Sequence, residues 1–129
     1  MKIKKRKAIY NVGYQGRTQQ EFIELLKAEG VTLLVDLRER PYNQKPDFNQ
    51  RRLSQTLHAE GIDYKPMGQL LGGFTCKRGA WQKGCEELAA LSKEHTIAMM
   101  CLEADYRKCH RKDVAEMLTF FHKITNINL

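Results

Sequence analysis

The hydrophobic positions of the chain follow two periods in turn, one of two residues and one of about 3.6 residues. Short apolar runs with strand character alternate with longer segments whose apolar residues fall on one helical face. The predicted strands are residues 8–12, 31–37, 62–65, 95–101 and 124–129. Helices are predicted between them, and their inward-facing residues are Phe22, Leu25 and Leu26, then Leu53 and Leu57, then Trp81, Cys85, Leu88 and Ala89, and last Val114, Met117, Leu118 and Phe121.

Capping and turn residues mark the ends of these helices. Thr18 and Glu21 have the spacing of a capping box at the start of the first helix, and Gly30 is predicted to end it. Asn49 is the expected cap of the second helix. Residues 66–79 contain one proline and four glycines and are therefore predicted to form a loop.

The order of strand and helix, repeated four times and closed by a last strand, predicts an α/β domain. Such an order favours a mainly parallel sheet, because parallel neighbours are joined by crossovers that helices usually provide. We therefore predict a three-layer fold of Rossmann-like or flavodoxin-like type, with four or five strands and helices on both faces. One α/β domain is expected over residues 8–129, preceded by a basic N-terminal tail at residues 1–7.

Charge is distributed unevenly along the chain. Its 129 residues include 22 Lys and Arg against 15 Asp and Glu, which gives a formal net charge of +7. The tail at residues 1–7 holds five of the basic residues and no acidic one, so the rest of the chain is nearly balanced. A charge of +7 favours a nucleic-acid partner, but most of the excess lies in one terminal segment.

The composition also argues against several classes of protein. The basic start resembles the first part of a secretory signal, but residues 8–15 contain polar residues and glycine and supply no adequate apolar region. The longest apolar runs have the length of strands, so neither a membrane-spanning segment nor a membrane partner is predicted. We expect a cytoplasmic protein, whose cysteines stay reduced and act as core residues, nucleophiles or ligands. These cysteines are Cys76, Cys85, Cys101 and Cys109.

Polar residues collect where the predicted parallel strands end. In open parallel sheets, ligands bind outside the carboxyl ends of the strands, where neighbouring connections diverge. The segments that follow these ends are expected to meet at one edge of the sheet. Their candidate site residues are Gly13, Tyr14, Arg17, Asp36, Arg38, Cys101, Glu103, Cys109, His110 and Arg111.

Two chemical roles are predicted within this set. A guanidinium binds phosphate or carboxylate oxygens through two parallel hydrogen bonds. The candidate anion-binding residues are accordingly Gly13, Tyr14, Arg17, Arg38 and Arg111. A carboxylate can act as a general acid or base, and a thiol can act as a nucleophile activated by a histidine. The candidate catalytic residues are Asp36, Cys101, Glu103, Cys109 and His110.

Three other interpretations of the segment after the fourth strand stay open. Cys101 and Arg107 fit the Cys-x5-Arg anion loop of rhodaneses and tyrosine phosphatases, although two acidic residues lie inside it. Cys101, Cys109 and His110 have the atom types of zinc ligands, but adjacent residues on a helix point in different directions. The third interpretation is structural, with ion pairs at the sheet edge and a buried cysteine. No cofactor is predicted.

The residues at these strand ends resemble one known family. The motifs that carry the resemblance are residues 11–18, residues 34–38, residues 70–73, and Cys101-x-Glu103-x5-Cys109-His110-Arg111. Over nearly its whole length the chain resembles the bacterial family called domain of unknown function 488. The resemblance implies a small cytoplasmic α/β protein that shares these polar residues, and it implies no established reaction. Members tend to carry a histidine in the last strand, where this chain has Asn126.

Two functions from different classes are therefore predicted. The first is an active or ligand site for a small anionic substrate, phosphate-like or nucleotide-like, at the carboxyl edge of the sheet. The second is a nucleic-acid-binding module, in which the tail and the Arg-rich segment 38–52 follow phosphates while aromatic residues stack on bases. These aromatic residues are Tyr14, Tyr42 and Phe74. The sequence favours the first function and leaves open whether the protein is an enzyme.

Overall fold

A computed structural model describes residues 8–38, 46–71, 78–103 and 111–129 of the chain. In chain order the elements are β1 (Ala8–Gly13), α1 (Gln19–Ala28), β2 (Leu33–Asp36), the short 3-10 helix η1 (Pro46–Phe48), α2 (Gln50–Ala59), β3 (Asp63–Pro66), α3 (Gly68–Leu71), α4 (Arg78–Leu91), β4 (Ile97–Cys101), α5 (Arg111–His122) and β5 (Thr125–Asn128). None of the described helices has the length and apolarity that a membrane crossing requires.

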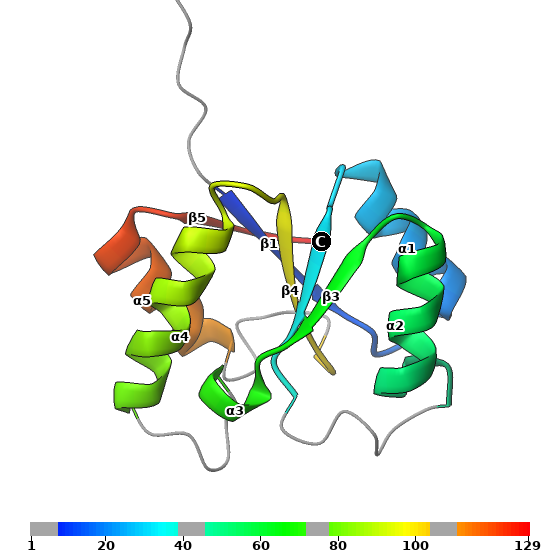
Figure 1. Ribbon diagram of the computed structural model, residues 1–129, viewed down its shortest axis with the longest axis horizontal. Coiled ribbons are helices and arrows are strands. Elements are labelled where there is room, and N and C mark those ends of the chain that lie inside the picture. Colours follow the sequence, from blue (N-terminus) through cyan, green and yellow to red (C-terminus); the bar gives the residue numbers. More distant parts are fainter. Residues whose placement is uncertain (1–7, 39–45, 72–77, 104–110) are drawn as a thin grey trace, which may run out of the picture.

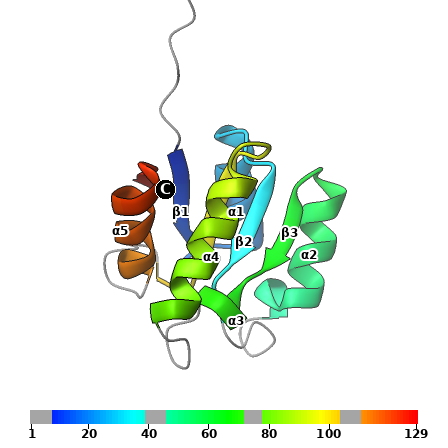
Figure 2. The ribbon, with the colours of Figure 1, turned by 60° about the vertical axis from the view of Figure 1, so that its left-hand side comes forward.

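The strands form one parallel sheet in the order β3-β2-β4-β1-β5 (Figure 1). Helices α1 and α2 cover one face of this sheet, and α4 and α5 cover the other (Figures 1 and 2). The predicted three-layer α/β fold is therefore confirmed, with five strands in the sheet.

Each face of the sheet has its own hydrophobic core, because neighbouring residues of a strand point to opposite faces. Leu34 and Met100 pack with α1 and α2, whereas Val35 and Met99 pack with α4 and α5. Every residue of β2 and of β4 is buried. Helices on both sides thus explain why these two strands are nearly continuous apolar runs in the sequence.

Local hydrogen bonds fix the ends of the helices on the α1 and α2 face. Thr18 Oγ1 accepts from the Glu21 backbone N–H, and Glu21 Oε1 accepts from the Thr18 backbone N–H, both over 3.1 Å. Gly30 has a φ of +68°, a conformation that residues with a side chain rarely adopt, so α1 ends before it. Asn49 Oδ1 accepts from the Arg51 backbone N–H over 3.1 Å. The capping box, the glycine stop and the asparagine cap are all confirmed.

Two local predictions are wrong. The sequence predicts a loop over residues 66–79, but α3 lies within this segment and α4 begins at its end. Leu71 in α3 is fully buried, so packing against the core favours a helical turn despite the glycines around it. Phe121 is predicted to face inward, but its side chain is 59% exposed. The buried face of α5 begins instead at Arg111 and continues through Val114 and Leu118, which turns Phe121 outward.

The chain connections diverge at the carboxyl ends of the central strands. β1 and β2 lead into α1 and α2 on one face, whereas β4, which lies between them, leads into α5 on the other face (Figure 2). Ligands of open parallel sheets bind at such a divergence. The topology therefore points to the ends of β1, β2 and β4 as the place to look for a site.

Candidate functional site

Backbone pairing sets the ends of β1, β2 and β4 at one level. Met100 in β4 is opposite Val12 on one side and opposite Asp36 on the other. The pairing continues beyond the strands, because the Tyr14 backbone N–H donates to the Cys101 carbonyl over 3.3 Å. The structure thus gathers at one edge five of the residues predicted from the sequence, namely Gly13, Tyr14, Asp36, Arg38 and Cys101.

Asp36 and Arg38 form a buried ion pair at the end of β2. The Asp36 side chain is fully buried, and that of Arg38 is 7% exposed. Asp36 Oδ1 accepts from the Arg38 backbone N–H over 2.9 Å and from Nε over 3.0 Å, and Oδ2 accepts from Nη2 over 2.8 Å. Burial acts to lower the pKa of Arg38, but the carboxylate outweighs it and raises that pKa. The guanidinium is therefore charged and held in one orientation.

Tyr64, which is absent from the residues predicted from sequence, completes the surroundings of Asp36. Its hydroxyl donates to Asp36 Oδ2 over 2.5 Å. Tyr64 lies in β3 opposite Leu34, so it shares a face of the sheet with Asp36, two residues further along β2. Burial and then the nearby carboxylate raise the pKa of Tyr64, so the phenol keeps its proton and stays a donor. The alternation of side chains along β3 could have indicated which face of the sheet Tyr64 lies on. Only the strand order and register identify Asp36 as its partner.

The carboxylate of Asp36 is saturated by these contacts. It accepts from the Arg38 backbone N–H, from Arg38 Nε and Nη2, and from the Tyr64 hydroxyl. Two carboxylate oxygens offer about four lone-pair positions in all. This arrangement favours a role for Asp36 in orienting Arg38 over the catalytic role predicted from the sequence.

Two buried polar atoms at this edge have no hydrogen-bond partner within the described ranges. They are Arg38 Nη1 and the hydroxyl oxygen of Tyr14. Tyr14 is 1% exposed, and its ring stacks on Phe48 with 4.7 Å between centroids. Arg38 Cζ lies 5.2 Å from the centre of the same tyrosine ring. Burial raises the pKa of Tyr14 despite the nearby guanidinium, so this hydroxyl also keeps its proton.

Arg111 is fully buried and binds the backbone of the protein itself. Its Nη1 donates to the Val12 carbonyl over 2.8 Å and to the Met99 carbonyl over 3.3 Å. Its Nη2 donates to the Glu103 carbonyl. The guanidinium therefore joins β1, β4 and the residues after β4. The ligand contact predicted for Arg111 from the sequence stays a prediction.

Arg17 is half-buried and also donates to backbone oxygens. These are the Gly13 carbonyl at 2.9 Å and the Leu129 main-chain oxygen at 3.1 Å. The contacts join the end of β1 to the residue that follows β5. Of the three predicted arginines, Arg38 is thus the one with a buried side-chain nitrogen that has no partner in the described part of the chain.

Comparison with known proteins places the chain in a family. Residues 18–83 and 75–118 match the family described as Domain of unknown function DUF488. The chain belongs to this family. The resemblance seen in the sequence is thereby confirmed. No curated protein and no solved structure matched the chain.

The matched region contains part of the candidate site of this DUF488 protein. Asp36, Arg38 and Tyr64 lie inside it, whereas Tyr14 and Arg17 lie before its first residue. The ion pair and its tyrosine donor therefore belong to the region by which the family is recognised. The description of the family names no activity.

The remaining candidate residues of the DUF488 chain follow β4. Cys101 is 6% exposed, and Glu103 is half-buried. Cys109 and His110 lie outside the described residues, so their predicted roles stay predictions. Across the described ranges, no three metal-binding side chains come together. A metal site that combines Cys101 with Cys109 and His110 needs two residues outside the described ranges and is likewise still a prediction.

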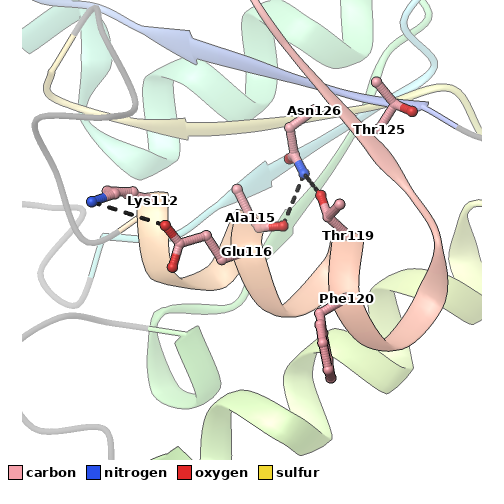
Figure 3. A pocket seen from close by; sticks show the side chains of 7 residues that line it. All are labelled: Lys112, Ala115, Glu116, Thr119, Phe120, Thr125 and Asn126. Carbon is pink, nitrogen blue, oxygen red and sulfur yellow. Dashed lines mark hydrogen bonds and ion pairs between the residues drawn. The ribbon is translucent and has the colours of Figure 1, made fainter.

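Asn126, the residue of the last strand at which the resemblance leads us to expect a histidine, makes hydrogen bonds through both of its side-chain polar atoms. Its Oδ1 accepts from Asn11 Nδ2 over 3.0 Å, and its Nδ2 donates to the Ala115 carbonyl over 3.0 Å (Figure 3). Asn11 is fully buried in β1. In this chain Asn126 therefore links β1, β5 and α5.

The predicted nucleic-acid contacts of the DUF488 chain are described only in part. Arg51 and Arg52 are exposed on α2, and Arg52 Nε is 3.8 Å from Asp47 Oδ1. Tyr14 is buried against Phe48, so its ring is closed to a stacking base in this conformation. The tail, Tyr42 and Phe74 lie outside the described residues, and the nucleic-acid alternative stays a prediction.

Proposed function

We propose that this protein binds a small anion, phosphate-like or nucleotide-like, at the ends of β1, β2 and β4. Arg38 Nη1 and the Tyr14 hydroxyl are its direct contacts. The observation that carries the proposal is that both groups are buried and, besides each other, have no hydrogen-bond partner in the described part of the chain. A buried polar group without a partner costs about 1–3 kcal/mol. An anion oxygen would supply the missing acceptor.

The charge balance of the site favours a singly charged ligand. Asp36 neutralises Arg38 within the ion pair, so these two side chains together offer donors without a net positive charge. Each further negative charge placed in a buried site adds a desolvation cost that neutral donors offset only in part. A phosphodiester or the monoanion of a phosphate therefore suits the site better than a phosphate dianion.

We assign no reaction to the site. Its central carboxylate already accepts from the Arg38 and Tyr64 donors, so it is a poor general base. The thiol and imidazole that would support nucleophilic chemistry, Cys109 and His110, lie outside the described residues. Binding is the part of the predicted function that the described contacts support.

Calorimetric titration with inorganic phosphate and with a nucleoside monophosphate tests the proposal. Arg38→Lys should weaken binding at least about tenfold, because one ammonium cannot both hold Asp36 at two points and present a further donor. Tyr14→Phe, which removes one hydroxyl and keeps the stacked ring, should weaken binding roughly three- to tenfold. Arg52→Lys, on the exposed face of α2, is the control and should leave affinity unchanged.

Two outcomes would contradict the proposal. The first is that neither anion binds saturably below about 10 mM, which corresponds to a binding free energy of roughly −3 kcal/mol. The second is that Tyr14→Phe and Arg38→Lys both bind with the affinity of the unmodified protein. Far-UV circular dichroism of each variant separates a lost contact from a lost fold.

A further inference from the structure

The Tyr14 ring contacts two flat groups, the Phe48 ring and the Arg38 guanidinium. Its centroid is 4.7 Å from that of Phe48, and the two ring planes are 20° apart. Arg38 Cζ lies 5.2 Å from the same Tyr14 centroid. Stacking of two rings and contact of a cation with a ring face each favour particular orientations of the ring. The two contacts therefore fix the plane in which the Tyr14 hydroxyl lies.

The Phe48 ring is itself held by packing against α1. It is 1% exposed and meets the ring of Phe22 edge-to-face, with 5.4 Å between the two centroids. Gln19 Nε2, at the start of α1, donates to the Asp47 carbonyl in η1 over 2.6 Å. Side chains in a close-packed interior interdigitate and occupy defined rotamers. Phe48 is therefore a firm support for the ring of Tyr14.

The orientation of the Tyr14 phenol decides where its hydroxyl can donate. Burial raises the pKa of Tyr14, and the nearby Arg38 guanidinium acts against this rise, so the two polar groups lie close together. The phenol keeps its proton and remains a donor. Hydrogen bonds weaken steeply when the angle at the donor hydrogen falls below about 120°. A tilt of the phenol would therefore weaken a contact that the hydroxyl and the guanidinium make jointly.

Phe48 can act on the anion site only through its packing, because its side chain has no polar atom. We propose that Phe48 is a positioning residue for anion binding. Its ring holds the Tyr14 phenol in the orientation in which the hydroxyl and Arg38 Nη1 donate to one anion. This inference rests on the anion-binding function proposed above, and it adds a residue that needs no contact with the anion.

A double-mutant cycle of Phe48→Leu and Tyr14→Phe tests the inference, with the affinity for inorganic phosphate measured by calorimetry. Phe48→Leu keeps an apolar side chain and removes the stacked ring. Alone, it should weaken binding roughly three- to tenfold, and no more than Tyr14→Phe does. In the Tyr14→Phe background the same change should alter the dissociation constant by less than about twofold, because the hydroxyl that Phe48 orients is already absent.

A control variant separates the loss of orientation from a general loss of stability. Leu57 in α2 is fully buried in the same hydrophobic core as Phe48. Leu57→Ala should lower the free energy of unfolding and leave the phosphate affinity of the folded protein unchanged. Far-UV circular dichroism checks the fold of each variant. If Phe48→Leu does not fold, Phe48→Met takes its place in the cycle, because a methionine side chain adapts to irregular gaps.

The outcomes that overturn this inference differ from the one that overturns the proposed function. If the unmodified protein binds phosphate and Phe48→Leu binds it equally well, Phe48 has no positioning role, although the proposed function stands. A loss of equal size in the Tyr14 and Tyr14→Phe backgrounds also overturns the inference, because Phe48 then acts independently of the hydroxyl. If the unmodified protein does not bind phosphate or a nucleoside monophosphate, both the function and the inference are overturned.

Discussion

The hydroxyl of Tyr64 in β3 donates a hydrogen bond to Asp36 Oδ2 in the neighbouring strand β2 over 2.5 Å. The same carboxylate oxygen accepts from Arg38 Nη2 over 2.8 Å. The tyrosine and the guanidinium thus hold one buried carboxylate between them. Tyr64 is therefore a positioning residue. It fixes the Asp36 carboxylate, which in turn orients the Arg38 guanidinium and its buried Nη1.

Replacing Tyr64 with Phe should lower the free energy of unfolding by about 1–3 kcal/mol, because the variant removes a donor from a buried carboxylate. Urea denaturation measures this loss. Tyr10→Phe, in a half-buried tyrosine near the start of β1, should cost less than about 0.5 kcal/mol. Equal losses in the two variants would mean that the bond to Asp36 contributes nothing measurable.

Replacing Asp36 with Asn should leave the buried Arg38 guanidinium without its counter-charge. We expect a loss of about 3–5 kcal/mol in the free energy of unfolding. Added phosphate should raise the melting temperature of this variant more than that of the unmodified protein, because the site then carries a net positive charge. Thermal unfolding with and without phosphate measures both effects. Asp47→Asn, which alters an exposed ion pair with Arg52, is the control and should change neither.

Replacing Arg111 with Met keeps much of the aliphatic volume and removes all of its donors. The carbonyls of Val12 and Met99 then lose a buried partner, and we expect the free energy of unfolding to fall by more than about 3 kcal/mol. Arg17→Met removes two contacts to backbone oxygens from a half-buried site and should cost about 1 kcal/mol. Urea denaturation compares the two variants, and a smaller loss for Arg111→Met would contradict its structural role.

Stability should fall as the pH rises above 9, in part because of Cys85. Burial raises the pKa of this thiol from 9.0 to about 11. The folded protein therefore keeps a proton that the unfolded chain loses, so the contribution of Cys85 is complete below pH 9 and disappears between pH 9 and about 11. Its share of the slope is at most about 1.4 kcal/mol per pH unit.

The variant Cys85→Ala isolates this contribution. Its free energy of unfolding should fall less steeply than that of the unmodified protein between pH 9 and 10. Above pH 10 both proteins should lose further stability, because the pKa values of Tyr14 and Tyr64 are also raised in the fold. Urea denaturation at several pH values measures the slopes, and parallel curves for the two proteins would contradict the assignment to Cys85.

Much of the fold follows from the sequence because its signals are local. The two-residue and helical periods predict the strands and helices, and the Thr18 and Glu21 pair predicts where α1 begins. The exceptions arise where long-range packing acts against a local preference. Leu71 is buried, so α3 forms in a segment rich in glycine, and the turn of α5 that buries Arg111 exposes Phe121.

The location of the candidate site was predictable from the sequence, whereas the hydrogen-bond partners of its residues were not. Parallel strands bring their carboxyl ends to one edge, and that rule needs only the order of strands and helices along the chain. Which arginine keeps a buried nitrogen without a partner depends on which acceptors surround each guanidinium. Arg111 lies among carbonyls of β1 and β4, whereas Arg38 lies beside the carboxylate of Asp36 at the end of β2 and the ring of Tyr14, the residue after β1.

The sequence by itself thus determined a parallel α/β domain, the edge of the sheet at which polar residues meet, and the family. Only the tertiary structure decided that Tyr64 reaches Asp36, that Arg111 donates to backbone carbonyls of β1 and β4, and that β5 lies at an edge of the sheet. The physical reason is that the hydrophobic period and the helix caps depend on residues that are close together in the sequence. Hydrogen bonds between strands depend instead on strand order and register, which the whole chain sets at once.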